Sequence, residues 1–449
     1  MDVLSVLSTV GGLPSLLKTG YTWIGPIVSR YRLSRYRLTP AFLVLCLLCL
    51  LAGCAGLAVG ESHTSVDGRP PAEQPMTFRT LGPDRRFSEL SSAAVAEQLR
   101  AARAGNALTI LALSGGGVGG AFGAGAIAGL TRAGTRPAFD VVTGVSAGAL
   151  IAPYAFLGPT WDQQLLDAFT GVAGDGLRQS RGLAVIFGSS FYSGRPLRNL
   201  IDAYVSDEMI HAIAHEAAKG RLLLVATTDV ASGEPVVWDL GSIAMNGGAS
   251  ARTLFRDVLV ASASVPGMFP PVIIRIEEDG FAHDQAHVDG AATMPFFVPP
   301  ALLQRTRNGP GTGRTAVFVI IDGSLSEGAR TTRLTARAIL SRSIRVGLDH
   351  LLLTTLELTA ATAQLEGADL QYSSLPLGYP LPDAFDFGAR IRRPLFQYAY
   401  QCAETGRLWM AFPLSNDDRD DRETSDGMAG TETVPCPSDN PLVGFFATR

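Results

Sequence analysis

Two buried strands that each run directly into a glycine-rich turn are the strongest constraint on the fold of this chain. Residues 108–113 (LTILAL) and 139–143 (FDVVT) are short apolar runs without a helical period, which is typical of core strands. A glycine loop at residues 114–120 and a small-residue helix that must pack closely follow the first strand. A strand–helix–strand unit of this kind predicts parallel strands with a right-handed crossover. We therefore expect an α/β domain with a mainly parallel central sheet.

The second strand ends in a Gly-x-Ser-x-Gly motif, Gly144-Val145-Ser146-Ala147-Gly148. A serine between a strand and a helix takes a strained backbone conformation that lifts its hydroxyl clear of the sheet. Gly144 and Gly148 are needed because the strand and the helix approach too closely for side chains. The helix that follows directs its first amides at the place where an oxyanion would form. The motif also fits an ordinary glycine-rich turn, so the rest of the chain has to decide its role.

The composition is that of a globular chain with enough apolar residues for a large core. Of the 449 residues, 47% are hydrophobic and only 17% are charged, which excludes a disordered or fibrous chain. The formal net charge is −4, and no basic stripe follows residue 60. Nucleic-acid binding therefore has no support.

The N-terminal region has the organisation of a secretory signal. Arginines at residues 30–37 precede the apolar run 41–53, which is short for a membrane span. Residues 51–54 (LAGC) resemble the bacterial lipobox, in which the cysteine is lipidated and becomes the first mature residue. This resemblance implies a signal segment at residues 1–53 and attachment to a membrane surface through Cys54. Ala55, in the place of an aspartate, favours the outer membrane of a bacterial cell envelope; an inner-membrane anchor formed by residues 41–53 is the alternative.

Further elements follow along the chain. Residues 54–77 are predicted to be a polar tether, and residues 416–440 an acidic, mobile loop. Further strands are expected at 221–229, 235–238, 272–276, 286–289 and 315–322, and helices at 91–104, 253–262 and 331–366. Cys402 and Cys436 enclose the acidic loop and are either a disulfide or two free thiols.

Three features meet in the order and spacing of a known family. They are the glycine loop (Gly115 to Gly120), the serine motif (Gly144 to Gly148) and Asp289-Gly290-Ala291 at the end of a later strand. Over residues 108–302 this constellation resembles the patatin-like phospholipases. The resemblance implies a three-layer α/β/α fold at 108–302 with a C-terminal extension, residues 303–449, packed on it. It also implies a serine acyl hydrolase that cleaves carboxylic esters of lipids, without metal or organic cofactor.

The resemblance also assigns roles to the residues of the motifs. Ser146 is the expected nucleophile and Asp289 its general base, with no histidine. A carboxylate with an ordinary pKa is a weak base in water, so Asp289 needs a dry pocket and direct contact with the hydroxyl. The expected oxyanion donors are backbone amides, those of Gly115, Gly116, Gly117 and Ala147. Gly119 stands where the family often has Arg or Lys, so a cation that could hold a phosphate is missing.

Two alternative functions use the same serine or the same fold. The order Ser146, Asp322, His350 fits a Ser-Asp-His triad, although residues 345–353 are expected to lie inside a helix, which favours a structural His350. A membrane-anchored lipoprotein that binds acyl chains without turnover would keep the fold and need no contact between Asp289 and Ser146.

Two further alternatives concern cofactors. Gly115, Gly117 and Gly120 with Asp140 match a dinucleotide-binding fingerprint, but the serine motif directly after Asp140 argues against it. His283 and His287 have the spacing of zinc ligands on a helix, yet the flanking residues predict a strand and a turn. Surface histidines are the favoured interpretation of this pair.

Overall fold

The computed structural model describes most of the chain from residue 76 onward. The described residues are 76–81, 87–102, 107–171, 190, 192–278, 281–304, 314–325, 334–376, 379, 387–412 and 434–439. They all belong to one compact unit, Glu73–Arg449. The predicted signal segment, Cys54, nearly all of the predicted tether and most of the predicted acidic loop lie outside the described residues.

One mixed sheet with a parallel centre runs through this unit. Its strand order is β11-β10-β9-β3-β4-β5-β6-β1-β2, and β8 pairs with both β5 and β7. The strands from β10 to β5 are parallel, as predicted, and mostly antiparallel pairs flank them. The strands are β1 (Thr77–Leu81), β2 (Phe87–Ser91), β3 (Thr109–Leu113), β4 (Val141–Val145), β5 (Leu222–Asp229), β6 (Pro235–Asp239), β7 (Val272–Glu278), β8 (Phe281–Asp289), β9 (Ala316–Ser324), β10 (Asp369–Leu375) and β11 (Met410–Ala411).

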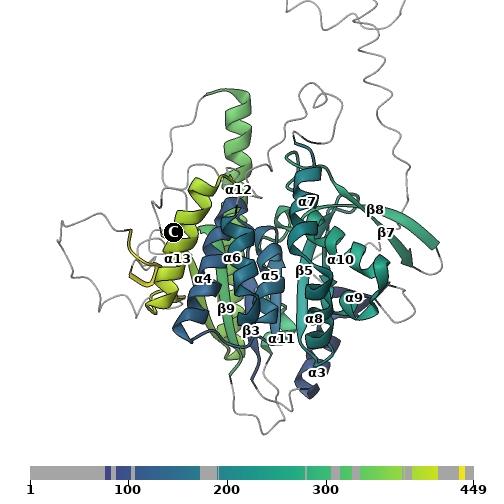
Figure 1. Ribbon diagram of the computed structural model, residues 1–449, viewed down its shortest axis with the longest axis horizontal. Helices are drawn as coiled ribbons and strands as arrows, with labels where there is room; N and C mark the ends of the chain where they lie inside the picture. Colours follow the sequence, from purple (N-terminus) through teal and green to yellow (C-terminus); the bar gives the residue numbers. More distant parts are fainter. Residues whose placement is uncertain are drawn as a thin grey trace, which may run out of the picture. The chain divides into compact units, whose positions relative to one another are not determined.

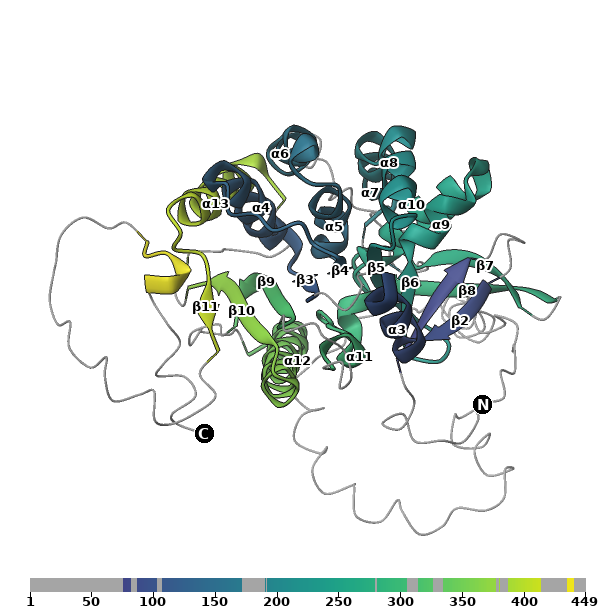
Figure 2. The ribbon, with the colours of Figure 1, turned by 90° about the horizontal axis from the view of Figure 1, so that it is seen from below.

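Helices cover both faces of the sheet, which confirms the predicted α/β/α layers (Figure 1). The helices are α3 (Ser92–Ala102), α4 (Gly120–Ala133), α5 (Ala147–Leu157), α6 (Asp162–Thr170), α7 (Arg195–Tyr204), α8 (Asp207–Ala217), α9 (Leu240–Asn246), α10 (Gly248–Ser262), α11 (Pro300–Leu303), α12 (Ala336–Glu366) and α13 (Ala389–Glu404). Figure 2 shows α4 to α10 and α13 on one face, and α3, α11 and α12 on the other. No helix among the described residues is long and apolar enough to cross a membrane.

Each face of the sheet buries an apolar core of its own. Along β3, the side chains of Leu111 and Leu113 belong to the core under α4 and α5, whereas Ile110 and Ala112 belong to the core under α3 and α12. Alternation across a strand sends successive side chains to opposite faces. A strand that is buried on both faces therefore has to be mostly apolar, which explains why the four residues of β3 after Thr109 are all apolar.

Helix α4 lies very close to α13, as its small residues predicted. A Cβ atom added at Gly125 would lie 2.2 Å from the carbonyl oxygen of Phe396, and one at Gly129 would lie 2.4 Å from that of Tyr400. Larger residues at either glycine would therefore push the two helices apart. Helix α13 also carries Cys402, which forms a disulfide with Cys436. Of the two states that the sequence left open, a disulfide or two free thiols, the structure has the disulfide.

Several boundaries differ from those expected. Strand β8 begins at Phe281 instead of Ala286, and α10 begins at Gly248 instead of Thr253. The β7–β8 hairpin stays paired as far as Glu278 and Phe281. Pairing with β7 therefore extends β8 over residues 281–285, whose polar sequence has no clear strand pattern. Strand β9 lies between β3 and β10, so the sheet continues beyond residue 302.

Candidate active site

Ser146 occupies a sharp turn between β4 and α5. Its backbone φ is 54° and its ψ is −121°, and it has the only positive φ of a non-glycine residue in the described part of the chain. This strained conformation is the one expected of a nucleophile at a strand-to-helix turn. A Cβ atom at Gly144 would lie 2.7 Å from the backbone of Gly148, and one at Gly148 would lie 2.5 Å from the carbonyl oxygen of Leu113. The two glycines of the motif are therefore required by close packing.

A second serine, Ser262 at the end of α10, supports this turn. Its hydroxyl oxygen accepts a hydrogen bond of 3.0 Å from the amide of Ser146 and donates one of 2.7 Å to the carbonyl oxygen of Ala226. Ser262 is fully buried, so both bonds are shielded from water. The residue was not predicted as part of the site, although a buried serine at the end of an apolar helix is itself a signal of a specific hydrogen bond.

The position of Asp289 follows from the pairing of two strands, β4 and β8, with successive parts of β5. Strand β4 pairs with β5 up to Val145 and Ala226, and β8 pairs with β5 from Asp289 and Thr227 onward. Because β6 pairs with Thr227 as well, β8 must lie on the same edge of β5 as β4. The carboxyl ends of β4 and β8 therefore meet head to head on one edge of β5. Ser146 directly follows the first end, and Asp289 closes the second.

The two side chains are in direct contact. The hydroxyl of Ser146 donates a hydrogen bond of 2.5 Å to Oδ2 of Asp289, and the amide of Ala291 donates one of 2.8 Å to Oδ1. Asp289 is 2% exposed and Ser146 is 5% exposed. Burial raises the pKa of Asp289 from 3.8 to about 7, against the opposite effects of the bonds from Ser146 and Ala291. A carboxylate with a pKa near neutrality is a much stronger base than one in water.

The predicted oxyanion donors do not all have free amides. The amide of Gly115 donates a hydrogen bond of 2.9 Å to the carbonyl oxygen of Pro295, so the prediction for Gly115 is wrong. Gly117 opens the 3₁₀ turn Gly117–Gly119 and Ala147 opens α5, and the first amides of a helix have no acceptor within it. Both residues line a pocket beside Ser146. Gly117 has a φ of 58°, which favours glycine at this position.

Other glycines of the two motifs are held by contacts. A Cβ atom at Gly120 would lie 2.9 Å from Cβ of Ala147, and one at Gly290 would lie 2.5 Å from the carbonyl oxygen of Ala226. A Cβ atom at Gly119 would lie only 1.9 Å from the carbonyl oxygen of Asp322. The end of β9 thus leaves no room for an Arg or Lys side chain at Gly119 in this chain.

A pocket of about 90 Å³ leads away from Ser146 between the helices on one face of the sheet. Most of its lining is apolar and comes from α5, α6 and α7, with Leu150, Phe169, Leu197, Leu200, Ile201 and Phe269 among the lining residues. One charged residue, Arg392 of α13, also lines it. The Arg392 guanidinium donates to the carbonyl oxygens of Phe169 and Gly171 at 2.9 and 2.6 Å, and so ties α13 to the end of α6. The arrangement suits an acyl chain rather than a polar group.

The structure does not bring His350 to the nucleophile. His350 is exposed on α12, which covers the opposite face of the sheet from α5 (Figure 2). Asp322 is fully buried, and its Oδ1 accepts a hydrogen bond from the amide of Gly123. The Ser146-Asp322-His350 triad is therefore contradicted.

The dinucleotide fingerprint is also contradicted by the geometry. Asp140 lies just before β4, where its Oδ2 accepts a hydrogen bond of 2.9 Å from the amide of Thr109 at the start of β3. The glycine loop follows the opposite, carboxyl end of β3. A ribose-binding carboxylate has to lie at the same end as the glycine loop.

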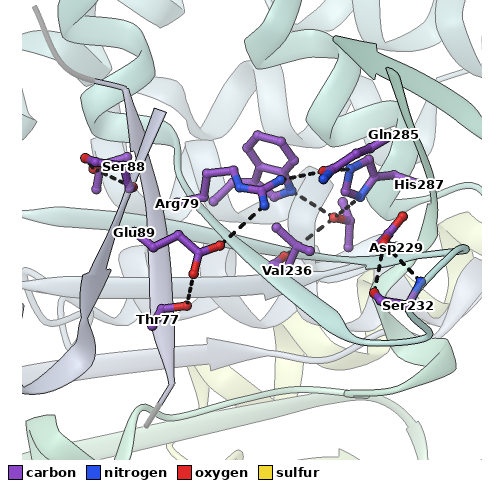
Figure 3. Close-up of polar contacts among 12 residues, drawn as sticks. Thr77, Arg79, Ser88, Glu89, Asp229, Ser232, Val236, Gln285 and His287 are labelled. Carbon is purple, nitrogen blue, oxygen red and sulfur yellow. Dashed lines mark hydrogen bonds and ion pairs between the residues drawn. The ribbon is translucent and has the colours of Figure 1, made fainter. Parts of the chain in front are cut away.

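The two candidate metal ligands lie on a strand, and one of them is buried. His287 is fully buried, so its expected position at the surface is wrong. It takes part in the polar network of Figure 3, with Nδ1 3.1 Å from the hydroxyl of Thr227 and Nε2 3.3 Å from Oε1 of Gln285. Arg79 donates to the same oxygen of Gln285 at 2.7 Å. Burial lowers the pKa of His287 to about 4, and within the described ranges no cluster of three or more His, Cys, Asp or Glu residues could hold a metal ion.

Comparisons with known proteins identify the central region. Residues 111–302 match the family model of the patatin-like phospholipases, which confirms the predicted resemblance for this region. No curated protein matches the chain. Among solved structures, the crystal structure of VipD from Legionella pneumophila aligns at 11% sequence identity with a TM-score of 0.32, covering 74% of this chain and 71% of that chain.

Proposed function

We propose that this chain is a lipid acyl hydrolase that cleaves carboxylic esters with Ser146 as nucleophile and Asp289 as general base. One observation carries the proposal: the buried 2.5 Å hydrogen bond between the two side chains, beside an apolar pocket that Ser146 lines. The match of residues 111–302 to the patatin-like phospholipases supports lipid esters as the substrate class.

The first half of the reaction forms an acyl-enzyme. Oγ of Ser146 attacks the ester carbonyl carbon while its proton passes to Oδ2 of Asp289. Negative charge then develops on the carbonyl oxygen, and the amides of Gly117 and Ala147, with that of Gly116, stabilise it. Asp289 next gives the proton to the departing alcohol oxygen. The acyl group remains on Ser146, with its chain in the apolar pocket.

The second half releases the fatty acid. Asp289, now a carboxylate again, takes a proton from water as the water oxygen attacks the acyl carbonyl carbon. Ser146 leaves with that proton, and the free acid departs. One carboxylate thus serves as base and acid in turn, and its pKa of about 7 suits both tasks at neutral pH.

We also propose that Cys54 is lipidated and holds the enzyme on the outer membrane of a bacterial cell envelope. The LAGC sequence at residues 51–54 supports this, as does the Cys402–Cys436 disulfide, which persists in oxidising compartments. Expression with labelled palmitate in a bacterial host tests it. The wild type should incorporate label into the membrane fraction and Cys54→Ala should not; equal labelling of both would contradict lipidation at Cys54.

Hydrolysis of a short-chain chromogenic ester by residues 73–449 tests the catalytic proposal. Ser146→Ala and Asp289→Asn should each lose at least about 10³-fold in kcat/KM while remaining folded. Asp284→Asn is a matched control, because Asp284 lies on the same strand as Asp289 but is exposed. If Asp289→Asn keeps its activity, the dyad is wrong.

A second assay separates hydrolysis from binding alone. Wild-type protein that is inert on esters and on phospholipid vesicles, but binds a fluorescent fatty acid in the pocket, would support the acyl-binding alternative. Covalent labelling of Ser146 by a fluorophosphonate would argue against that alternative, because labelling requires an activated serine.

A further inference from the structure

The carboxylate of Asp322 is fully buried beside the glycine loop, yet the proposed reaction does not use it. Asp322 lies near the end of β9, which pairs with β3 as far as Ile320 and Leu113. The glycine loop, residues 114–120, follows β3 directly. We propose that Asp322 is a positioning residue that fixes this loop in the orientation in which its amides meet the oxyanion. The inference rests on the proposed function for the role of those amides.

The backbone of Asp322 is bound to the start of the loop. Its amide donates a hydrogen bond of 2.9 Å to the hydroxyl oxygen of Ser114, and the amide of Ser114 donates one of 3.0 Å to the carbonyl oxygen of Ile320. Ser114 and Asp322 are both fully buried, so water does not compete for these bonds. The first residue of the loop is therefore held to β9 by two hydrogen bonds.

The carbonyl group of Asp322 sets the path of the loop by contact. A Cβ atom at Gly116 would lie 1.7 Å from this oxygen, and one at Gly119 would lie 1.9 Å from it. The backbones of these two loop residues thus lie so close to the same carbonyl group that neither residue could carry a side chain. Gly117, whose amide is an expected oxyanion donor, lies between these two contacts.

The side chain of Asp322 holds the far end of the loop. Oδ1 accepts a hydrogen bond of 3.0 Å from the amide of Gly123, in the first turn of α4. Amides in the first turn of a helix are the positive end of its dipole and favour a carboxylate. Within the described residues, Oδ2 has no hydrogen-bond partner. Asp322 thus binds the chain on both sides of the loop, Ser114 through its backbone amide and Gly123 of α4 through its carboxylate.

Asp322 acts through the loop and not on the substrate. It does not line the pocket beside Ser146, and its Oδ1 is already engaged with Gly123. Burial raises the pKa of this carboxyl well above 3.8, against the opposite effect of the bond from Gly123. The position needs an oxygen acceptor, so asparagine should replace aspartate. Alanine should keep the backbone contacts of residue 322 with the loop but release the amide of Gly123 and with it the end of the loop that leads into α4.

Kinetics with a transition-state analogue test the proposal. Asp322→Ala should lower kcat for a short-chain ester by about 10- to 100-fold with little change in KM, because a misplaced donor weakens the transition state more than the ground state. The affinity for a trifluoromethyl ketone, which forms a tetrahedral oxyanion on Ser146, should fall by the same factor. Asp322→Asn should retain kcat within about threefold, since it keeps an acceptor for Gly123.

Asp140 provides the matched control. Its buried carboxylate also accepts a hydrogen bond from a backbone amide, that of Thr109, but at the opposite end of β3 from the glycine loop. Asp140→Ala should lower the melting temperature without changing kcat or the analogue affinity. If Asp322→Ala behaves like Asp140→Ala, or if its kcat falls while the analogue affinity stays unchanged, Asp322 does not position the oxyanion donors.

Hydrogen exchange provides a readout that does not depend on ester hydrolysis. Asp322→Ala should accelerate amide exchange in residues 114–123 and leave the amide of Thr109 protected, whereas Asp140→Ala should do the reverse. If the wild type is inert on esters but this pattern holds, the loop is positioned by Asp322 and the proposed function is what fails. Unchanged exchange in residues 114–123 overturns the positioning role itself.

Discussion

Oγ of Ser146 lies 2.5 Å from Oδ2 of Asp289, although 143 residues separate the two in the chain. They come from β4 and β8, which do not pair with each other but end at the same edge of β5. This arrangement puts a carboxylate in direct contact with a serine hydroxyl, with no histidine between them.

Ester hydrolysis should depend on the ionisation of Asp289. The carboxyl has to be deprotonated to accept the proton of Ser146, and burial raises its pKa to about 7. We expect kcat/KM to rise with pH through about 7 and to level off above it. Asp284→Asn should give the same profile, and a rate that is flat between about pH 5 and 9 would contradict the role of Asp289 as base.

Asp289→Asn should stabilise the protein at high pH. The folded state binds the Asp289 proton up to about pH 7, whereas an unfolded aspartate releases it near 3.8. The free energy of unfolding therefore falls as the pH rises from about 4 to about 7, by up to about 4 kcal/mol, and the lost stability does not return above pH 7. Thermal melts should show a higher melting temperature for Asp289→Asn than for wild type at pH 8 and nearly equal values at pH 3. If Asp289→Asn instead melts at a lower temperature than wild type at pH 8, the ionised carboxylate stabilises the fold and this prediction is wrong.

Gly119→Ala should damage both the fold and the reaction. The added Cβ atom meets the carbonyl oxygen of Asp322 at 1.9 Å, so the loop or β9 has to shift. We expect a loss of about 1–3 kcal/mol in the free energy of unfolding and a lower kcat. Gly323→Ala is the control, because a Cβ atom there meets nothing within 4 Å. Equal behaviour of the two variants in melts and assays would show that the contact is not restrictive.

Leu200→Trp should shift the preference toward short acyl chains. Leu200 is half-buried and lines the apolar pocket, so a larger side chain takes up space that the chain of a long acyl ester would use. The ratio of kcat/KM for an octanoate over an acetate ester should fall by about 10-fold or more, the scale at which hydrophobic pockets discriminate chain length. An unchanged ratio would place the acyl chain elsewhere.

Reduction of the Cys402–Cys436 disulfide should destabilise the C-terminal part of the protein. The two cysteines are 34 residues apart, and closing a loop of that length contributes about 3–4 kcal/mol by the chain-entropy estimate. The melting temperature should fall on addition of a reductant in the wild type. The double variant Cys402→Ala/Cys436→Ala should start at the lower value and not respond, and a response in this variant would point to another reducible group.

The sequence motifs predicted the centre of the fold but not how its parts meet. The strands β3, β4, β5 and β9 were visible as apolar runs because strands buried on two faces are mostly apolar, and the glycine loop was visible as a motif. The beginning of β8 and the hydrogen bond from the amide of Ser146 to Ser262 were not visible, because a polar stretch and a single hydroxyl have no hydrophobic period. Gly115 was taken for an oxyanion donor because a glycine motif does not reveal which amides are already bound, here to Pro295.

The amino-acid sequence by itself determined the local geometry: the strained turn at Ser146, the close-packed glycines around it and the parallel direction of the neighbouring strands β3 and β4. These depend on residues near one another in the chain, where sterics and burial leave few alternatives. The tertiary structure alone decided that β8 ends against β4 on β5, that the Asp289 carboxyl is buried with a raised pKa, and that His350 lies on the opposite face. Burial and long-range pairing depend on the packing of the whole chain, so a pattern in one segment cannot determine them.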